Sequence, residues 1–341
     1  MQTTTVASGT AEGPAGRPES PMRDSILAGL ANYIDAGSIV AGSAALALWA
    51  ELYRMSPTTI GLIGAFSANA ISAGVGALIG GVLCDRFGRK RIYQYDLLFY
   101  AFGMAWLTFA WAPWMIILGF VLVGLAVGAD IPASWSLIAE LAPKKQRARF
   151  SGIAQILWYL GPVVVLTLGL LLAPLGILGI RLIFAHLLVL ALVLTLLRSR
   201  MRESRYWEEA RAADDHAAKS DWRQLLKPKY LKSILFLIGM YGFWNLWAGT
   251  NGFFFPYILR TVGGQSQEAS VALQALNFAL GILSILFVFM RLSDKVNQRT
   301  LFMTSALLQV AGMALLALLP LTGTVAVIHV LIMATAVGFG A

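Results

Sequence analysis

Long apolar stretches alternate with short polar turns along almost the whole chain of 341 residues. Ten such stretches stand out, and all but the last have about 20 residues or more, the length that crosses a hydrocarbon layer as a helix. They are Ile26–Ala50, Thr59–Leu83, Ile92–Ala112, Trp114–Ala139, Phe150–Leu172, Ile177–Leu197, Leu231–Leu259, Ser270–Met290, Leu301–Leu319 and Thr324–Ala341. The pattern predicts an all-α membrane protein whose tenth span is cut off by the end of the chain.

The longest polar interval separates six spans from four, which predicts two helix bundles joined by a loop. The expected parts are a disordered cytoplasmic tail (1–24), an N-terminal six-helix bundle (25–198), a cytoplasmic linker loop (199–230) and an incomplete C-terminal helix bundle (231–341). The turns Asp85–Lys90 and Asp294–Arg299 occupy matching places in the two groups, which indicates an internal repeat. We therefore expect two six-helix halves, the second truncated after about four helices.

Basic residues are concentrated in alternate turns. With the N-terminus inside, 23 of the 26 Lys and Arg residues lie on the cytoplasmic side, and Arg54, Arg181 and Arg260 lie outside. This distribution predicts a multi-pass protein of the inner or plasma membrane with a cytoplasmic N-terminus. The net charge of +9 does not indicate nucleic-acid binding, because the basic residues flank apolar helices and do not form one soluble face.

Residue patterns typical of enzymes are missing from the sequence. The His and Cys residues have no metal-binding spacing, and no Gly-rich phosphate loop with a Lys occurs. The Gly-x-Gly patterns lie within spans and predict close helix packing instead. We therefore expect a protein that is not an enzyme and needs neither a metal nor a cofactor.

The turn after the second span has a charge pattern that predicts a latch. Asp85 falls at the C-terminal end of a helix, where the helix dipole disfavours an acid, so it needs a cationic partner. Arg89 lies four residues further on, beside Arg86, and Gly88 permits the sharp reversal of the chain. The alternative is a solvated basic loop that serves only to set orientation.

Four segments carry a family resemblance. The run Gly81–Lys90 resembles the signature loop of the major facilitator superfamily, and Glu140–Arg147 matches the E-x-x-P-x-x-x-R pattern of its sugar porter group and metabolite:proton symporter relatives. Glu203–Trp207 is similar to the P-E-S-P-R-W motif without its prolines. Asn245 and Gly249–Asn251 fall where the group has Q-Q-x-x-G-x-N.

The resemblance covers roughly residues 25–341 and implies the major facilitator fold and secondary transport. It implies a sugar-binding role for Gln155, whereas Phe120 stands where family members usually have an Arg. The predicted latch as a whole comprises Asp85, Arg86, Gly88, Arg89, Glu140, Arg147 and Asp294.

Acidic residues within the spans are candidates for proton coupling. Asp35 lies about ten residues into the first span, where a charge costs about 2.5–3.5 kcal/mol and calls for a cavity or a partner. It can carry a proton as its exposure alternates, or it can be a structural acid bonded to nearby backbone. Asp130, followed by Pro132, is a second proton-site candidate, and Asp96 is expected to form a structural pair with Arg91.

Uncharged polar and aromatic side chains are the substrate-binding candidates, because amides exchange hydrogen bonds with hydroxyls and indole faces stack on sugar C–H faces. The seventh span is interrupted by Gly249, Gly252 and Pro256, as expected of a helix that bends at a gate. The candidates are Gln155, Trp158, Asn245, Trp247, Asn251 and Asn277.

These features predict proton-coupled uptake of a sugar or polyol such as inositol by alternating access. The expected partners are a small-molecule substrate, protons and the lipid bilayer, with the chain acting as a monomer. Two alternatives remain. An organic or aromatic acid:proton symporter would need a cation in the pore, and none is evident among the spans. A transporter-derived receptor or scaffold would dispense with the coupling acids, and Asp35 is present.

Overall fold

The computed structural model describes residues 21–67, 70–141, 147–198, 207–208, 226–293 and 295–340, and the regular elements in these ranges are helical. The first group of elements is α1 (Pro21–Leu52), α2 (Pro57–Ala65), α3 (Ile71–Phe87), α4 (Arg89–Thr108), α5 (Pro113–Leu141), α6 (Arg147–Leu171), the 3₁₀ turn η2 (Ala173–Leu175) and α7 (Ile177–Arg198). The second group is α9 (Pro228–Gly249), the π-helical turn η4 (Thr250–Phe254), α10 (Phe255–Thr261), α11 (Gln267–Ser284), the π-helical turn η5 (Ile285–Phe289), α12 (Met290–Leu292), α13 (Gln298–Leu318) and α14 (Gly323–Gly340).

Except for the second, each apolar stretch picked out from the sequence coincides with a helix or with a continuous run of helices. In the described part of the chain, seven helices are by themselves long and apolar enough to cross a membrane. The other three predicted spans do not meet this criterion as single helices. The second is broken between α2 and α3, α4 begins with three basic residues, and α9 begins beside Lys229 and gives way to η4.

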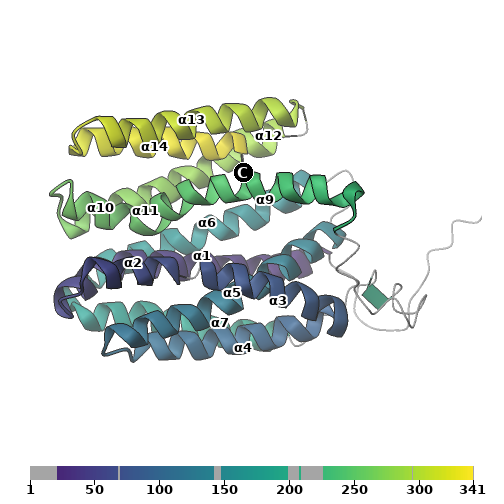
Figure 1. Cartoon of the computed structure of the whole chain (residues 1–341), viewed down its shortest axis with the longest axis horizontal. Coiled ribbons are helices and arrows are strands. Elements are labelled where there is room, and N and C mark those ends of the chain that lie inside the picture. The colour runs from purple at the N-terminus through teal and green to yellow at the C-terminus, as the bar shows by residue number, and fades with distance from the viewer. Residues whose placement is uncertain are drawn as a thin grey trace, which may run out of the picture.

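The helices run side by side across Figure 1, so their connections gather at two ends of the bundle. We call the end that carries the α3–α4 and α12–α13 turns the basic end, since residues 85–91 and 291–299 supply its Arg and Lys side chains. The opposite end carries the α1–α2, α4–α5, α6–α7, α10–α11 and α13–α14 connections. The basic turns of the described chain thus share one end, as the charge pattern predicts.

Elements α1–α7 pack closely around an aromatic and aliphatic core. Trp49, Phe120 and Phe184 form ring contacts there, with centroids 5.6–6.4 Å apart. Glycines allow the closest helix approaches. A Cβ on Gly161 of α6 would lie 2.1 Å from the carbonyl oxygen of Tyr33 on α1, and one on Gly128 of α5 would lie 2.0 Å from that of Ala73 on α3. In the Gly-x-Gly pattern Gly74–Gly76, a Cβ on Gly76 of α3 would lie 2.3 Å from the carbonyl oxygen of Leu125 on α5, so the expected close packing is confirmed at this glycine.

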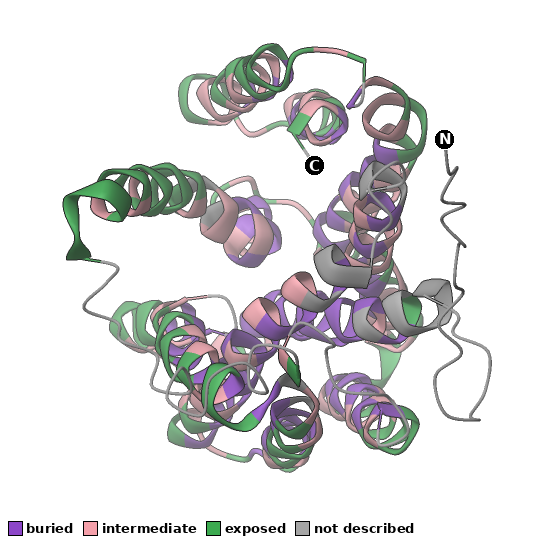
Figure 2. Ribbon diagram, turned by 90° about the vertical axis from the view of Figure 1, so that its right-hand side faces the viewer, coloured by how far each residue is buried: buried purple, intermediate pink, exposed green. Residues whose placement is uncertain are grey.

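The later helices meet the first group mainly where α11 packs on α6 and where η4 and α10 pack on α1. Helix α9, by contrast, is exposed along most of its length, as its green colouring in Figure 2 shows. Figure 2 also shows that buried residues are concentrated in the first group. The two groups therefore touch along a limited seam, and the candidate site lies on it.

Candidate functional site

A cavity of about 140 Å³ lies between the two helix groups. Helices α1, α2 and α6 line it on one side, and α9, η4, α11 and α14 line it on the other. Most of its wall is apolar or aromatic, and its hydrogen-bonding side chains are uncharged. The polar and ring-bearing members of the lining include Ser67, Trp158, Tyr159, Trp244, Asn251 and Asn277.

The π-helical turn η4 shapes one wall of the cavity. The sequence predicts a break here from Gly249, Gly252 and Pro256, and the chain widens into a π turn at Thr250–Phe254, which follows Gly249, contains Gly252 and ends before Pro256. A π turn leaves backbone carbonyls that need other donors. Gln274 of α11 supplies them, since its Nε2 donates to the carbonyls of Asn251 at 3.1 Å and Gly252 at 3.2 Å.

The structure gathers three of the six predicted substrate residues at this cavity. Trp158, Asn251 and Asn277 line it, from α6, η4 and α11 respectively. Gln155 and Asn245 are half-buried and are not part of its lining. The Trp247 side chain lies outside the described residues. A substrate role for all six stays a prediction.

His329 belongs to the site, although sequence reasoning did not select it. It is completely buried in α14, where Nδ1 lies 2.9 Å from the carbonyl oxygen of Gly312 on α13 and Nε2 lies 2.9 Å from Oδ1 of Asn251. Its ring also packs against Phe255, with centroids 5.2 Å apart. The available signal was a single imidazole in an otherwise apolar span.

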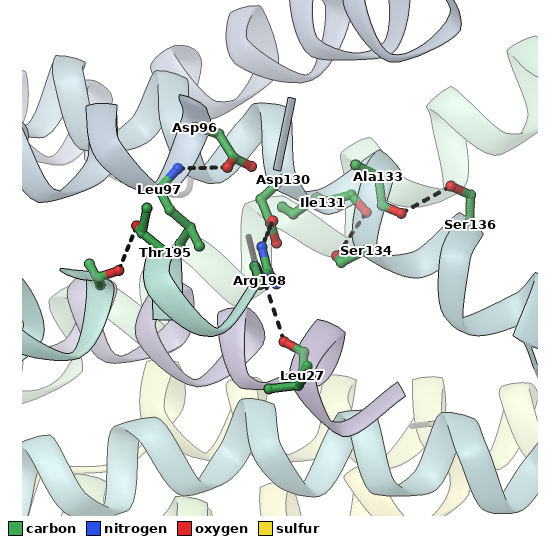
Figure 3. Close-up of polar contacts among 11 residues, drawn as sticks. Leu27, Asp96, Leu97, Asp130, Ile131, Ala133, Ser134, Ser136, Thr195 and Arg198 are labelled. Atoms are coloured by element: carbon green, nitrogen blue, oxygen red, sulfur yellow. Dashed lines mark hydrogen bonds and ion pairs between the residues drawn. The ribbon is translucent and has the colours of Figure 1, made fainter. Parts of the chain in front are cut away.

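A second polar centre lies inside the first helix group, and its residues are not part of the cavity lining. Asp35 of α1, Asp96 of α4 and Asp130 of α5 are 2–7% exposed, and Arg198 of α7 is 1% exposed. Arg198 Nη1 forms an ion pair with Asp130 Oδ1 at 2.8 Å, and its Nε donates to the carbonyl of Leu27 at 3.3 Å (Figure 3). We call these three acids and the arginine the acid cluster.

The acid cluster holds more carboxylate oxygens than donors. One oxygen of each acid, the Oδ2 atom, is enclosed without a hydrogen-bond partner. Asp35 interacts electrostatically with both Asp96 and Asp130, and Asp96 also accepts a hydrogen bond from the Leu97 backbone at 2.6 Å. Among the described side chains, Arg198 is the one cation that acts on all three acids.

One sequence-based expectation is wrong here. Asp96 forms no ion pair with Arg91 in the described chain, because Asp96 points into the bundle while Arg91 is exposed. Arg198, by contrast, was expected only as one of the basic residues of the connecting segment. It is the last residue of α7 and folds inward because Asp130 and the Leu27 carbonyl satisfy its guanidinium.

The predicted latch is only partly visible. Gly88 links α3 to α4 with φ of 92°, so its predicted role in the reversal is confirmed. Asp85 and Arg86 are exposed, and the carbonyl of Asp85 accepts a 3.0 Å hydrogen bond from the Trp207 indole. Residue 294 and the side chains of the remaining latch members, Arg89, Glu140 and Arg147, lie outside the described residues, so pairing within the latch stays a prediction.

A polar bridge joins the helix groups at the opposite end. Arg260 of α10 forms an ion pair with Glu51 of α1 and donates to Gln267 Oε1 at 2.9 Å. Gln267 in turn donates from Nε2 to the carbonyl of Ala44 on α1 at 2.9 Å. The bridge holds the groups together at this end of the cavity.

Comparison with known sequences identifies relatives of most of the chain. Residues 26–341 match the family described as Major Facilitator Superfamily. The minor myo-inositol transporter IolF of Bacillus subtilis (strain 168) is 50% identical over 305 residues, which are 87% of this chain and 69% of that protein. Plastidic glucose transporter 4 of Arabidopsis thaliana is 25% identical over 284 residues, 74% of this chain and 50% of that protein.

Solved structures share the helix arrangement. A crystal structure of D-xylose-proton symporter has a TM-score of 0.68 at 17% identity and covers 93% of this chain and 79% of its own. The inward open conformation of the xylose transporter XylE from E. coli has a TM-score of 0.66 at 18% identity, with 94% and 80% covered. Identities this low show the fold alone.

Proposed function

The chain belongs to the major facilitator superfamily, and from that premise we propose that it moves a small polyhydroxy solute, such as myo-inositol, by proton-coupled alternating access. It is a multi-pass membrane transporter and not an enzyme, in keeping with its relatives. The observation that carries the solute class is the uncharged, hydrogen-bonding lining of the cavity between the helix groups. The relative named as a myo-inositol transporter supports the same class.

The cavity chemistry suits hydroxyl groups better than carboxylates. Each amide of Asn251 and Asn277 can both donate to and accept from a hydroxyl, and the Trp158 ring offers an apolar face for C–H groups. A carboxylate solute would call for Lys or Arg, and the described lining contains neither. We therefore place an organic or aromatic acid second to a sugar or polyol.

The acid cluster is the proposed proton site. Three ionised carboxylates around one guanidinium would leave two uncompensated charges in a buried setting, which is strongly unfavourable. The cluster therefore retains at least one proton unless a movement opens it to water. Asp35 is adjacent in sequence to Ala36, which lines the cavity, so motion of α1 affects both centres.

Alternating access needs two helix groups that rock about the cavity. We propose that residues 25–198 and 231–341 are those groups, with the basic end and the N-terminus in the cytoplasm of a cell whose plasma membrane holds the protein as a monomer. The Glu51–Arg260 bridge supports a state closed at the opposite, external end. The Asp85 turn and its Trp207 contact lie at the basic end, where the latch is proposed to act.

Uptake by the purified full-length protein in liposomes tests this function. An inwardly directed proton gradient should drive accumulation of radiolabelled myo-inositol, and a protonophore should abolish that accumulation. Excess unlabelled sugar or polyol should compete, whereas aromatic acids should not. Accumulation of an aromatic acid in place of the polyol would favour the second candidate, and uptake indifferent to the gradient would refute proton coupling.

A further inference from the structure

His329 makes two hydrogen bonds that together constrain the cavity-lining Asn251. The ring is fully enclosed, and the polar groups that face it are the carbonyl oxygen of Gly312 and the amide of Asn251, each at 2.9 Å. A carbonyl oxygen can only accept, so the Gly312 contact requires a proton on Nδ1. The protonation of Nδ1 is therefore fixed, and the protonation of Nε2 determines the orientation of the Asn251 amide.

The protonation of Nε2 decides which end of the Asn251 amide faces the ring. A ring protonated on both nitrogens donates from Nε2, so it holds Oδ1 and turns the NH₂ group away. An uncharged ring with its proton on Nδ1 has only a lone pair at Nε2, so it must accept from the NH₂ group and turn the oxygen away. In either state the ring selects one orientation.

The other end of the amide meets the cavity. Asn251 lines the cavity, and in the described chain its Nδ2 has no hydrogen-bond partner and is not among the enclosed polar atoms. The backbone of Asn251 is held by Gln274, whose own side chain is fully buried. Because these hydrogen bonds hold the backbone, the Asn251 side chain can change mainly by rotation of its amide. The hydrogen bond to His329 restrains that rotation.

We propose that His329 is a positioning residue that orients the Asn251 amide and thereby sets whether this residue donates to, or accepts from, a hydroxyl of the bound solute. The inference rests on the proposed function for the identity of the solute, but the ring–amide coupling does not depend on it. His329 makes no direct contact with the cavity, so it acts through Asn251 alone.

Charged groups on the elements around His329 lie at the ends of their helices. The Asn251 amide is therefore the polar side chain that acts most directly on the His329 ring. His329 is near the middle of α14, and Gly312 lies thirteen residues beyond Arg299 on α13, about 20 Å along a helix. The titratable or charged side chains on the elements that pack around the ring are Tyr257 and Arg260 on α10, Glu268 on α11, Arg291 on α12 and Arg299 on α13.

A double-mutant cycle on the full-length protein measures the coupling by equilibrium binding of myo-inositol. His329→Phe keeps a ring against Phe255 but removes both hydrogen bonds, and Asn251→Ala removes the amide. Each should weaken binding about tenfold, and the double variant should bind no more weakly than either single one. His186→Phe is the matched control, because the hydrogen bond between His186 and Tyr33 lies outside the cavity lining. The affinity of this variant for myo-inositol should equal that of the wild-type protein.

Two binding results would overturn the proposal: wild-type affinity in His329→Phe, or an additive loss of about a hundredfold in the double variant. A second readout is independent of the solute. The chain has three His residues, so ¹⁵N-labelled histidine can be resolved by NMR, with the His329 signal assigned from its absence in the Phe variant. Nδ1 should carry a proton, and Asn251→Ala should shift the Nε2 signal.

The two readouts separate failure of the inference from failure of the proposed function. If the wild-type protein does not bind myo-inositol but the Nε2 signal responds to Asn251→Ala, the solute is wrong and the positioning role stands. An unprotonated Nδ1, or an Nε2 signal indifferent to Asn251, refutes the positioning role whatever the solute is.

Discussion

The two polar centres of this protein differ in charge, partners and access. The acid cluster, Asp35, Asp96, Asp130 and Arg198, lies within the first helix group, and three acids share one cation there. The polar network of the second group, His329, Asn251 and Gln274, has no acid, and it opens onto the cavity through Asn251.

In the proposed mechanism, this difference separates proton handling from solute recognition. Uncharged groups bind a neutral solute without a large desolvation cost, whereas a buried excess of carboxyls binds protons because ionised acids are unfavourable there. Helix α1 connects the two, since Asp35 belongs to the cluster and its neighbour Ala36 lines the cavity. In the proposed mechanism, coupling requires movement of α1, because the solute does not contact the proposed proton site.

The largest expected effect comes from removing the cluster's cation. Arg198→Met leaves Asp130 without its ion pair and should destabilise the protein by about 3–5 kcal/mol, the cost of breaking a buried pair. Thermal unfolding in detergent measures it, and Arg198→Lys, which keeps a positive charge, should lose less. Unchanged stability in Arg198→Met would show that the cluster is not held together by this charge.

The next effect is functional. Asp35→Asn removes one ionisable group from the cluster but keeps its size, so gradient-driven accumulation should be abolished while counterflow exchange continues. Uptake and exchange are measured in the same liposomes. The exposed Glu268→Gln serves as a control acid and should retain both activities. Persistent accumulation in Asp35→Asn would contradict its coupling role.

A smaller effect is expected in the cavity, and a comparison of two asparagines six residues apart, Asn245 and Asn251, makes the test specific. Asn251→Ala should raise KM about tenfold, which corresponds to about 1.4 kcal/mol. Asn245, on the preceding helix but outside the cavity lining, should change KM less when replaced by alanine. Equal effects from both substitutions would mean that the solute contacts a longer stretch than the cavity lining.

The smallest effect concerns the bridge that links the helix groups at the end opposite the basic turns. Glu51→Gln breaks the ion pair with Arg260, and because the Glu51 side chain is 63% exposed the loss should be only about 0.2–1 kcal/mol. It should increase the fraction of molecules open at this end, measured by thiol labelling of a cysteine placed at Ala44. If most molecules became open at this end, the Glu51–Arg260 bridge would be a principal gate of the transporter.

The spans could be predicted well from local sequence. The length of an apolar stretch and the position of a turn residue such as Gly88 can be read from the sequence without knowing how the helices pack. The acid cluster could not be assembled in the same way. Arg198 and Asp130 are 68 residues apart, and Arg198 occurs in a run that reads as the start of a polar loop. Its burial depends on how α5 and α7 pack against α1, which periodicity does not encode.

The cavity was predictable in composition but not in arrangement. Glycines and a proline marked the break in the seventh span, and Asn251 was selected for its amide. The contact between Asn251 and His329 spans 78 residues, and a lone histidine in an apolar helix gives no indication of its partner. Asn245 shares its chemistry with Asn251, yet only helix rotation decides which of them lines the cavity.

The wide turn at Thr250–Phe254 gives this wall of the cavity a mechanical property of its own. Each residue of an α-helix advances about 100° around the axis, so relocating the extra residue by a single position would swing a neighbouring side chain through roughly that angle. Asn251 sits within the turn, and such a shift would carry its amide from the cavity into the wall. If the Gln274 hydrogen bonds to this turn broke, winding of the helix would withdraw the proposed ligand contact without any tilt of the bundle.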